Sequence, residues 1–218
     1  MQYLRFLIKA FFLNIYFWIF SLFLQNINGA EDTESWSSIG YETKLPYSFK
    51  LELAQGLRFK DQLSSFKQTH TDISISYKII DGMKIFIPIR YTILEDKIKK
   101  RFSIGGSYKY NLKPINIKCR IKFQRNYEDD EFSKDLIRNK IFIDYKINKI
   151  FKPYISNEFF YLYELNQYKY DEYRTSFGIY VNLPKKKEMK IFYTYKMEDI
   201  TKKSPDQINI FGIAYNFK

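Results

Sequence analysis

Apolar side chains occupy every second position through most of this chain, and that period constrains the fold more than any other feature. The clearest stretch is 115–125, where isoleucine, cysteine and phenylalanine alternate with asparagine, lysine, arginine and glutamine. Successive side chains of a β-strand point to opposite faces, so each such stretch predicts a strand with one apolar and one polar face. No long stretch keeps the period of a helix. The sequence therefore predicts an all-β fold.

Ten segments carry this pattern, and short links alternate with longer, polar links between them. The segments are roughly 47–60, 70–80, 82–94, 100–110, 114–125, 136–148, 151–163, 172–183, 188–199 and 207–217, and the longer links are 62–69, 126–135, 164–171 and 200–206. Outer-membrane barrels combine an even number of antiparallel strands with short periplasmic turns and longer outer loops. We therefore expect an antiparallel, transmembrane up-and-down β-barrel of about ten strands, with both chain ends in the periplasm.

The segment 36–42 has the composition of an eleventh strand, which conflicts with closure by an even number of strands. We interpret it as a lead-in segment, or as part of a twelve-strand arrangement.

Strand length separates a membrane barrel from a soluble sandwich. Spanning the hydrocarbon layer takes about nine to eleven tilted residues, whereas strands of globular proteins usually have about five or six. Most of the segments reach the longer value.

The first thirty residues differ from all that follow. Arg5 and Lys9 precede a mainly apolar run, and a polar stretch then ends at the small residue Ala30. This order predicts a secretory signal peptide over residues 1–30, cleaved between Ala30 and Glu31. An uncleaved anchor is the alternative. We expect residues 31–218 to form a single barrel domain in the cell outer membrane, reached through the periplasm.

The formal net charge of +12 is also compatible with nucleic-acid binding. Export argues against that partner, and the basic residues are scattered along the chain instead of massed in one block. We expect no nucleic-acid partner.

Cys119 is the only cysteine, which excludes an intramolecular disulfide and a cysteine-rich zinc site.

If the apolar face of the strands meets lipid, the opposite face lines the interior and carries charges of both signs. The residues predicted to face this lumen are Glu52, Arg58, Asp72, Lys78, Arg90, Arg120, Arg138, Asp144, Glu158 and Arg174. Charges in a narrow barrel must pair, because an isolated charge in a low dielectric is costly. Two interpretations stay open. The lining is a structural polar core, or it conducts small solutes, with anions favoured by arginine and lysine.

His70 is the only histidine, and Ser64, Ser65 and Asp72 lie close to it in the sequence. Their spacing is generic and no nucleophile elbow is present. We therefore expect an exposed loop histidine, no enzymatic activity and no cofactor. One alternative is a lipid-modifying barrel enzyme in which His70 faces an accessible serine at the outer leaflet. Another is a soluble periplasmic β-protein that buries its apolar face and binds an acidic ligand.

The acidic run 128–131 contains side chains that bind calcium in other proteins. A solvated loop is the preferred interpretation, so we expect no metal site.

Several short sequence motifs occur in a characteristic order over nearly the whole mature chain. They are Trp36, Leu51-Glu52-Leu53, Leu57-Arg58-Phe59, Thr71-Asp72, Ser76-Tyr77-Lys78, Tyr108-Lys109-Tyr110, Arg120 to Gln124, Arg138-Asn139-Lys140, Pro153-Tyr154, Glu158-Phe159-Phe160, Arg174, Gly178 and Phe211-Gly212 to Phe217. In this order they resemble a family of small Gram-negative outer-membrane barrels classed as a domain of unknown function. The resemblance implies location and fold; it supplies neither a substrate nor catalytic residues.

Phe217 is similar to the terminal aromatic residue by which barrel proteins are recognised for insertion, although Lys218 follows it. The expected partners are outer-membrane lipid and lipopolysaccharide, with barrel-assembly machinery during insertion. The sequence thus predicts a monomeric outer-membrane barrel that is structural or narrowly permeable.

Overall fold

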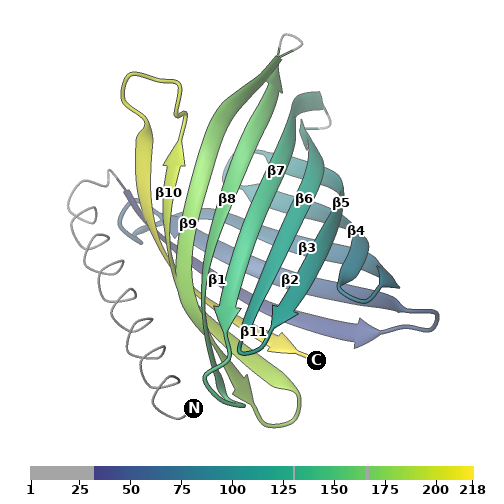
Figure 1. Cartoon of the computed structure of the whole chain (residues 1–218). Helices are drawn as coiled ribbons and strands as arrows, with labels where there is room; N and C mark the ends of the chain where they lie inside the picture. The colour runs from purple at the N-terminus through teal and green to yellow at the C-terminus, as the bar shows by residue number, and fades with distance from the viewer. Residues whose placement is uncertain (1–31, 130, 165–166) are drawn as a thin grey trace. The chain divides into compact units, whose positions relative to one another are not determined.

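The computed structural model describes residues 32–129, 131–164 and 167–218, which form one closed β-barrel (Figure 1). Its strands are β1 (Asp32–Lys44), β2 (Phe49–Lys60), β3 (Ser65–Ile80), β4 (Met83–Leu94), β5 (Ile98–Leu112), β6 (Ile115–Glu128), β7 (Glu131–Tyr145), β8 (Phe151–Glu164), β9 (Gln167–Leu183), β10 (Lys187–Glu198) and β11 (Asp206–Phe217). None of the described residues forms a helix long and apolar enough to cross a membrane. The predicted signal peptide and the cleavage site at Ala30 and Glu31 lie outside the described residues.

Neighbouring strands in the sequence pair antiparallel, and β1 closes the barrel by pairing parallel with β11. The predicted all-β barrel is confirmed, but its strand count is eleven among the described residues and not ten or twelve. The segment 36–42 lies inside β1 and is a full strand of the wall. The odd number of strands places the start of β1 and the end of β11 at opposite ends of the barrel, and not at the same end as expected. Asp32 pairs near one end of the barrel, whereas Phe217 pairs with Tyr41 near the other.

The links predicted to be long are shorter in the structure, because the strands continue into them. Of the four, three are mostly strand: β3 begins at Ser65, β7 at Glu131 and β9 at Gln167, while 199–205 remains a longer link. These strand ends are rich in polar and charged residues. Apolar alternation therefore fades there, although the backbone ladder continues.

The apolar face of the barrel points outward and the polar face points inward. On β6, the apolar residues Ile121 and Phe123 are 56% and 40% exposed. The alternating polar residues Lys122 and Gln124 are only 8% and 1% exposed. This inverts the usual arrangement of a water-soluble protein. The alternative of a soluble β-protein requires a buried apolar face, and the structure does not meet that requirement.

Inward-facing glycines allow rings to lie flat against the wall. The Phe192 ring on β10 covers Gly212 on β11, so that a Cβ added at Gly212 would overlap the ring. The Tyr154 ring on β8 covers Gly178 on β9 in the same way. Glycine is required at these positions by the close approach of the neighbouring side chain.

The parallel seam predicts a specific crosslink. In a Cys119→Ser background, Ser38→Cys with Ala214→Cys should form a disulfide, because these residues are paired in the seam. Paired strands lie about 5 Å apart, within the Cα separation that a disulfide accepts. Non-reducing electrophoresis and peptide mass spectrometry would detect the bond. The control is Ser38→Cys with Ile210→Cys, which is offset by about 13 Å along the strand. A disulfide in the control, or none in either variant, would contradict this seam.

A second prediction concerns Gly212. Gly212→Ala should lower the free energy of unfolding by roughly 1–3 kcal/mol, since Phe192 must leave its position. Urea unfolding of the barrel in lipid vesicles measures this loss. Gly106→Ala is the matched control, because its added Cβ would meet no atom closer than 3.9 Å. Equal losses in the two variants would show that the ring contact is unimportant.

Candidate functional site

A cavity of about 650 Å³ lies inside the barrel. Its lining includes Lys67 and Glu198, near the strand ends that adjoin the β2–β3 and β10–β11 links. It also includes Lys84 and Lys118, near the tight turns at the other end of the barrel. The lining of this one cavity therefore spans most of the length of the strands.

The cavity lining is strongly basic. Among the residues that the structure describes, fifteen Lys and Arg and six Asp and Glu line it. The lining carries an excess of nine positive charges, and the formal net charge of the whole chain is +12. The excess on the lining is thus three-quarters as large as the net charge of the chain. Basic residues that are scattered along the sequence meet here, because alternate positions of successive strands share one face of the sheet.

The structure brings most of the predicted lumen residues together. Eight of them line the cavity: Glu52, Arg58, Asp72, Arg90, Arg120, Arg138, Glu158 and Arg174. Asp144 is buried nearer the tight turns, where its Oδ1 accepts a hydrogen bond of 2.7 Å from Asn116 Nδ2. Lys78 lies beside the β3–β4 turn, where its exposed side chain pairs with Asp81.

Sequence reasoning missed many other residues of the lining. They include Glu34, which is buried beside it, and Lys67, Lys99, Arg101, Lys118, Lys122, Lys134, Lys140, Glu172, Lys190, Lys196 and Glu198. For several of them, the alternating pattern of the sequence already places the side chain on the polar face of a strand. Lys118 and Lys122, for example, share the polar face of 115–125 with Arg120.

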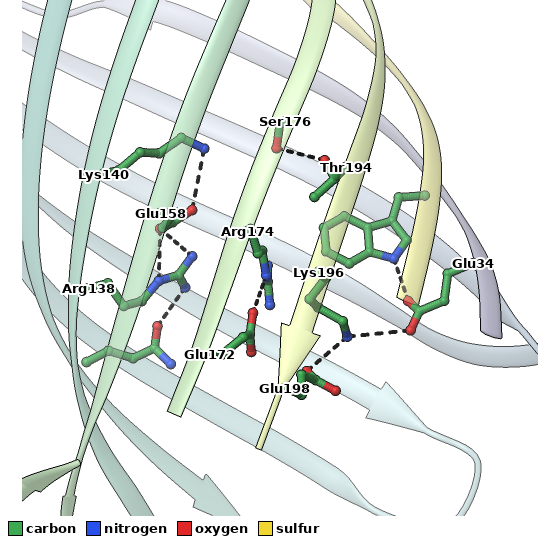
Figure 2. Close-up of polar contacts among 12 residues, drawn as sticks. Glu34, Arg138, Lys140, Glu158, Glu172, Arg174, Ser176, Thr194, Lys196 and Glu198 are labelled. Carbon is green, nitrogen blue, oxygen red and sulfur yellow. Dashed lines mark hydrogen bonds and ion pairs between the residues drawn. The ribbon is translucent and has the colours of Figure 1, made fainter. Parts of the chain in front are cut away.

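One group of charges is balanced, and we call it the paired cluster: Glu34, Lys67, Glu172, Arg174, Lys196 and Glu198. Glu34 is fully buried and accepts hydrogen bonds from Lys67 Nζ at 2.5 Å and Trp36 Nε1 at 2.7 Å. Lys196 Nζ lies 2.9 Å from Glu198 and 3.6 Å from Glu34 (Figure 2). Arg174 pairs with Glu172 on the same strand. Three cations and three carboxylates thus meet in this cluster.

A second group is not balanced, and we call it the basic wall: Arg101, Arg120, Lys122, Arg138, Lys140 and Glu158, on β5 to β8. Glu158 Oε1 accepts hydrogen bonds of 2.7 Å from Arg138 Nη2 and from Arg120 Nη2. Its other oxygen lies 3.4 Å from Lys140 Nζ (Figure 2). One carboxylate therefore serves three cations.

Two buried amides orient the arginines of the basic wall without neutralising them. Arg138 Nη1 donates a hydrogen bond of 2.9 Å to Gln124 Oε1. Gln124 Nε2 donates to Asn126 Oδ1 at 3.0 Å, and Arg101 Nε donates to the same oxygen at 3.2 Å. Gln124 and Asn126 are each buried. An amide oxygen fixes the direction of a guanidinium but removes none of its charge.

Aromatic rings cover the faces of three guanidinium groups. Arg58 lies 3.7 Å from the centroid of the Trp36 ring, and Arg174 lies 5.2 Å from the same ring. Arg138 and Arg174 lie 4.3 Å and 4.7 Å from the centroid of the Phe160 ring. Such contacts hold a cation in place while the N–H groups at its edge stay available for hydrogen bonds.

The expectation of an exposed loop histidine is wrong. His70 lies on β3 and is buried, with its ring against Gly56 and its Nε2 3.9 Å from Asp72 Oδ2. The error arises because β3 extends five residues before His70, into the segment predicted as a loop. Ser64 lies in the preceding turn, where its hydroxyl donates to the carbonyl oxygen of Asp61.

Part of the acidic run 128–131 is engaged in hydrogen bonds and ion pairs. Glu128 pairs with Lys97 at 3.0 Å and with Lys99, and Asp129 Oδ1 accepts a hydrogen bond from the backbone N–H of Ile98. Across residues 32–129, 131–164 and 167–218, no group of three His, Cys, Asp or Glu side chains is arranged to hold a metal ion.

The family model described as protein of unknown function DUF2490 matches residues 33–209. No curated protein matches the sequence significantly. Among solved structures, the NanC porin is 12% identical with a TM-score of 0.46, over 75% of this chain and 86% of that chain. The KdgM porin is 11% identical with a TM-score of 0.46, over 72% and 80%. An anion-selective porin from Comamonas acidovorans is 10% identical with a TM-score of 0.41, over 82% and 55%.

The shared carboxylate of the basic wall generates a prediction. Glu158→Gln should lower the free energy of unfolding by roughly 3–5 kcal/mol, because buried cations lose their counter-charge. Denaturant titration of the barrel in lipid vesicles measures the loss. Glu52→Gln is the control, since Glu52 pairs with Lys50 but its side chain is 40% exposed; its loss should stay below about 1 kcal/mol. Similar losses would mean that burial of Glu158 does not matter.

Proposed function

The chain belongs to the DUF2490 family, and we propose that it forms an outer-membrane barrel whose lumen gives small anions a narrow passage. The observation that carries the proposal is the excess of nine positive charges on the cavity lining, counted over the described residues. Rings of arginine and lysine favour anions in a pore. The cations of the lining raise the local concentration of anions and exclude small cations.

The outer surface supports a position in a membrane. A closed barrel satisfies the backbone hydrogen bonds of its strands without water, which a hydrocarbon layer requires. On β6 and β7 the ion pair of Arg125 with Asp135 follows the outward residues Phe123 and Ile137, and the rings of Tyr127 and Phe132 lie beyond it. Toward the tight turns, the outward residue Tyr108 of β5 suits the headgroup level. The outward face therefore has an apolar band with polar or amphipathic borders.

The interior supports a narrow passage and not a wide pore. Near the tight turns the Phe142 and Tyr154 rings stack inside the barrel with centroids 4.9 Å apart, and Tyr180 lies 5.1 Å from Tyr154. Lys190 lies over the Tyr154 ring at 4.9 Å. These side chains occupy part of the lumen at this level and narrow the proposed passage.

The structural and conducting interpretations of the lining apply to different residues in this proposal. The paired cluster, with equal numbers of cations and carboxylates, holds the wall together around the seam. The basic wall, with five cations and one carboxylate, supplies four of the nine excess positive charges that act on solutes. We propose no enzymatic activity for the barrel, because His70 faces the interior beside Asp72 and Arg90, away from the lipid.

Conductance tests this proposal. Full-length protein is expressed in a Gram-negative host, recovered from outer membranes as a band that shifts on heating, and inserted into planar bilayers under a KCl gradient. We expect a small conductance whose reversal potential shows chloride preferred over potassium. Lys122→Gln combined with Arg101→Gln should lower this preference several-fold, because two uncompensated cations of the lining are removed.

Lys78→Gln is the control for that experiment, since Lys78 lies beside a turn and outside the cavity lining. It should leave the reversal potential unchanged. A heat-shifting barrel with no conductance, or one that prefers potassium, would overturn the proposed passage.

A further inference from the structure

We infer that the basic wall is a binding site for an oxyanion that carries two or more negative charges, of the phosphate or polycarboxylate class. The inference rests on the proposed function, since the passage delivers such an anion to the site, and it adds a class of solute. The basic wall combines five cations with one carboxylate, whereas the paired cluster combines three with three. An anion with several charges would balance the basic wall as the paired cluster is already balanced.

Three donors of adjoining strands β5 and β6 point to a missing acceptor. Lys122 is 8% exposed and lines the cavity, and it makes no hydrogen bond or ion pair with the residues that the structure describes. Arg120 Nε and Ser103 Oγ are buried, and each is without a hydrogen-bond partner among those residues. A buried donor without an acceptor costs free energy. Oxygen atoms of a bound anion would remove that cost.

The register places these donors close to one another. Ser103 on β5 pairs with Gln124 on β6, and Lys122 on β6 pairs with Gly105 on β5 and with Arg138 on β7. Arg120 and Lys122 are successive inward residues of one strand. The absence of a side chain at Gly105 leaves the Phe86 ring over that position. One side of Lys122 is thus apolar and the other carries the guanidinium of Arg138.

The geometry favours an oxyanion over chloride. Arg101 and Arg138 are oriented by the amides of Asn126 and Gln124, so their direction is fixed before any ligand arrives. A guanidinium presents N–H groups in a rigid fork that matches pairs of oxygen atoms. Donors from several strands require several acceptor atoms, which chloride does not provide. Because Glu158 already serves three cations, the anion binds mainly to the donors that Glu158 leaves unmatched.

Titration calorimetry of the purified full chain in a non-ionic detergent at low salt tests the inference, with pyrophosphate and citrate as separate probes. We expect saturable binding of at least one probe at one site per barrel. Excess chloride at equal ionic strength should compete only weakly. The stronger of the two probes identifies the phosphate or the polycarboxylate class as the ligand.

Lys122→Gln should weaken the binding at least tenfold. Lys78→Gln is the matched control, because it removes one cation beside the β3–β4 turn and outside the cavity lining; its effect should stay below about twofold. Both variants are first checked for the heat-dependent shift of a closed barrel. Absence of saturable binding, or equal weakening in the two variants, would overturn the site.

The binding measurement requires no conductance, so the two proposals fail separately. A barrel that binds the probe but conducts no chloride would overturn the passage and retain the site. A barrel that prefers chloride over potassium but binds neither probe would retain the passage and overturn the site.

Discussion

Closure of the sheet on itself is the constraint on which the rest of this structure depends. In hydrocarbon an unpaired backbone N–H or C=O group has no water to bind, so an open edge is not tolerated. The parallel ladder between β1 and β11 removes both edges at once. Once the ring is closed, each strand has one face toward the surroundings and one toward the lumen. The alternation of the sequence, the outward isoleucines and the gathering of charge inside all follow from that geometry.

The sequence predicts the strand pattern well wherever one face is apolar and the other polar. It predicts β1 poorly, because its outward residues include Ser35 and Ser37 and its inward residues include Trp36. It also predicts strands that are too short beside the longer links, since residues of both faces are polar there. The prediction of a loop at His70 is wrong for the same reason, because His70 lies within the ladder of β3 with β2 and β4.

Alternation identifies which side chains face the lumen, but it does not identify their partners. Arg120, Arg138 and Glu158 lie on different strands, and their contacts depend on the stagger between those strands. The sequence therefore shows charges of both signs without showing that they divide unevenly. The paired cluster and the basic wall differ in charge balance although the same residue types build both. That difference is a property of the closed barrel and is absent from any single strand.

The parallel seam has a topological consequence for the membrane. Asp32 at the start of β1 lies near the β2–β3 link, whereas Phe217 at the end of β11 lies near the turn that precedes Lys187 (Figure 1). If the barrel lies in the outer membrane as proposed, with the tight turns on the periplasmic side, the start of β1 faces the cell exterior. β1 then forms a hairpin with β2 on the periplasmic side and pairs with β11, which runs in the same direction across the layer. A peptide tag joined just before β1 would be displayed at the cell surface, while a tag after β11 would stay in the periplasm.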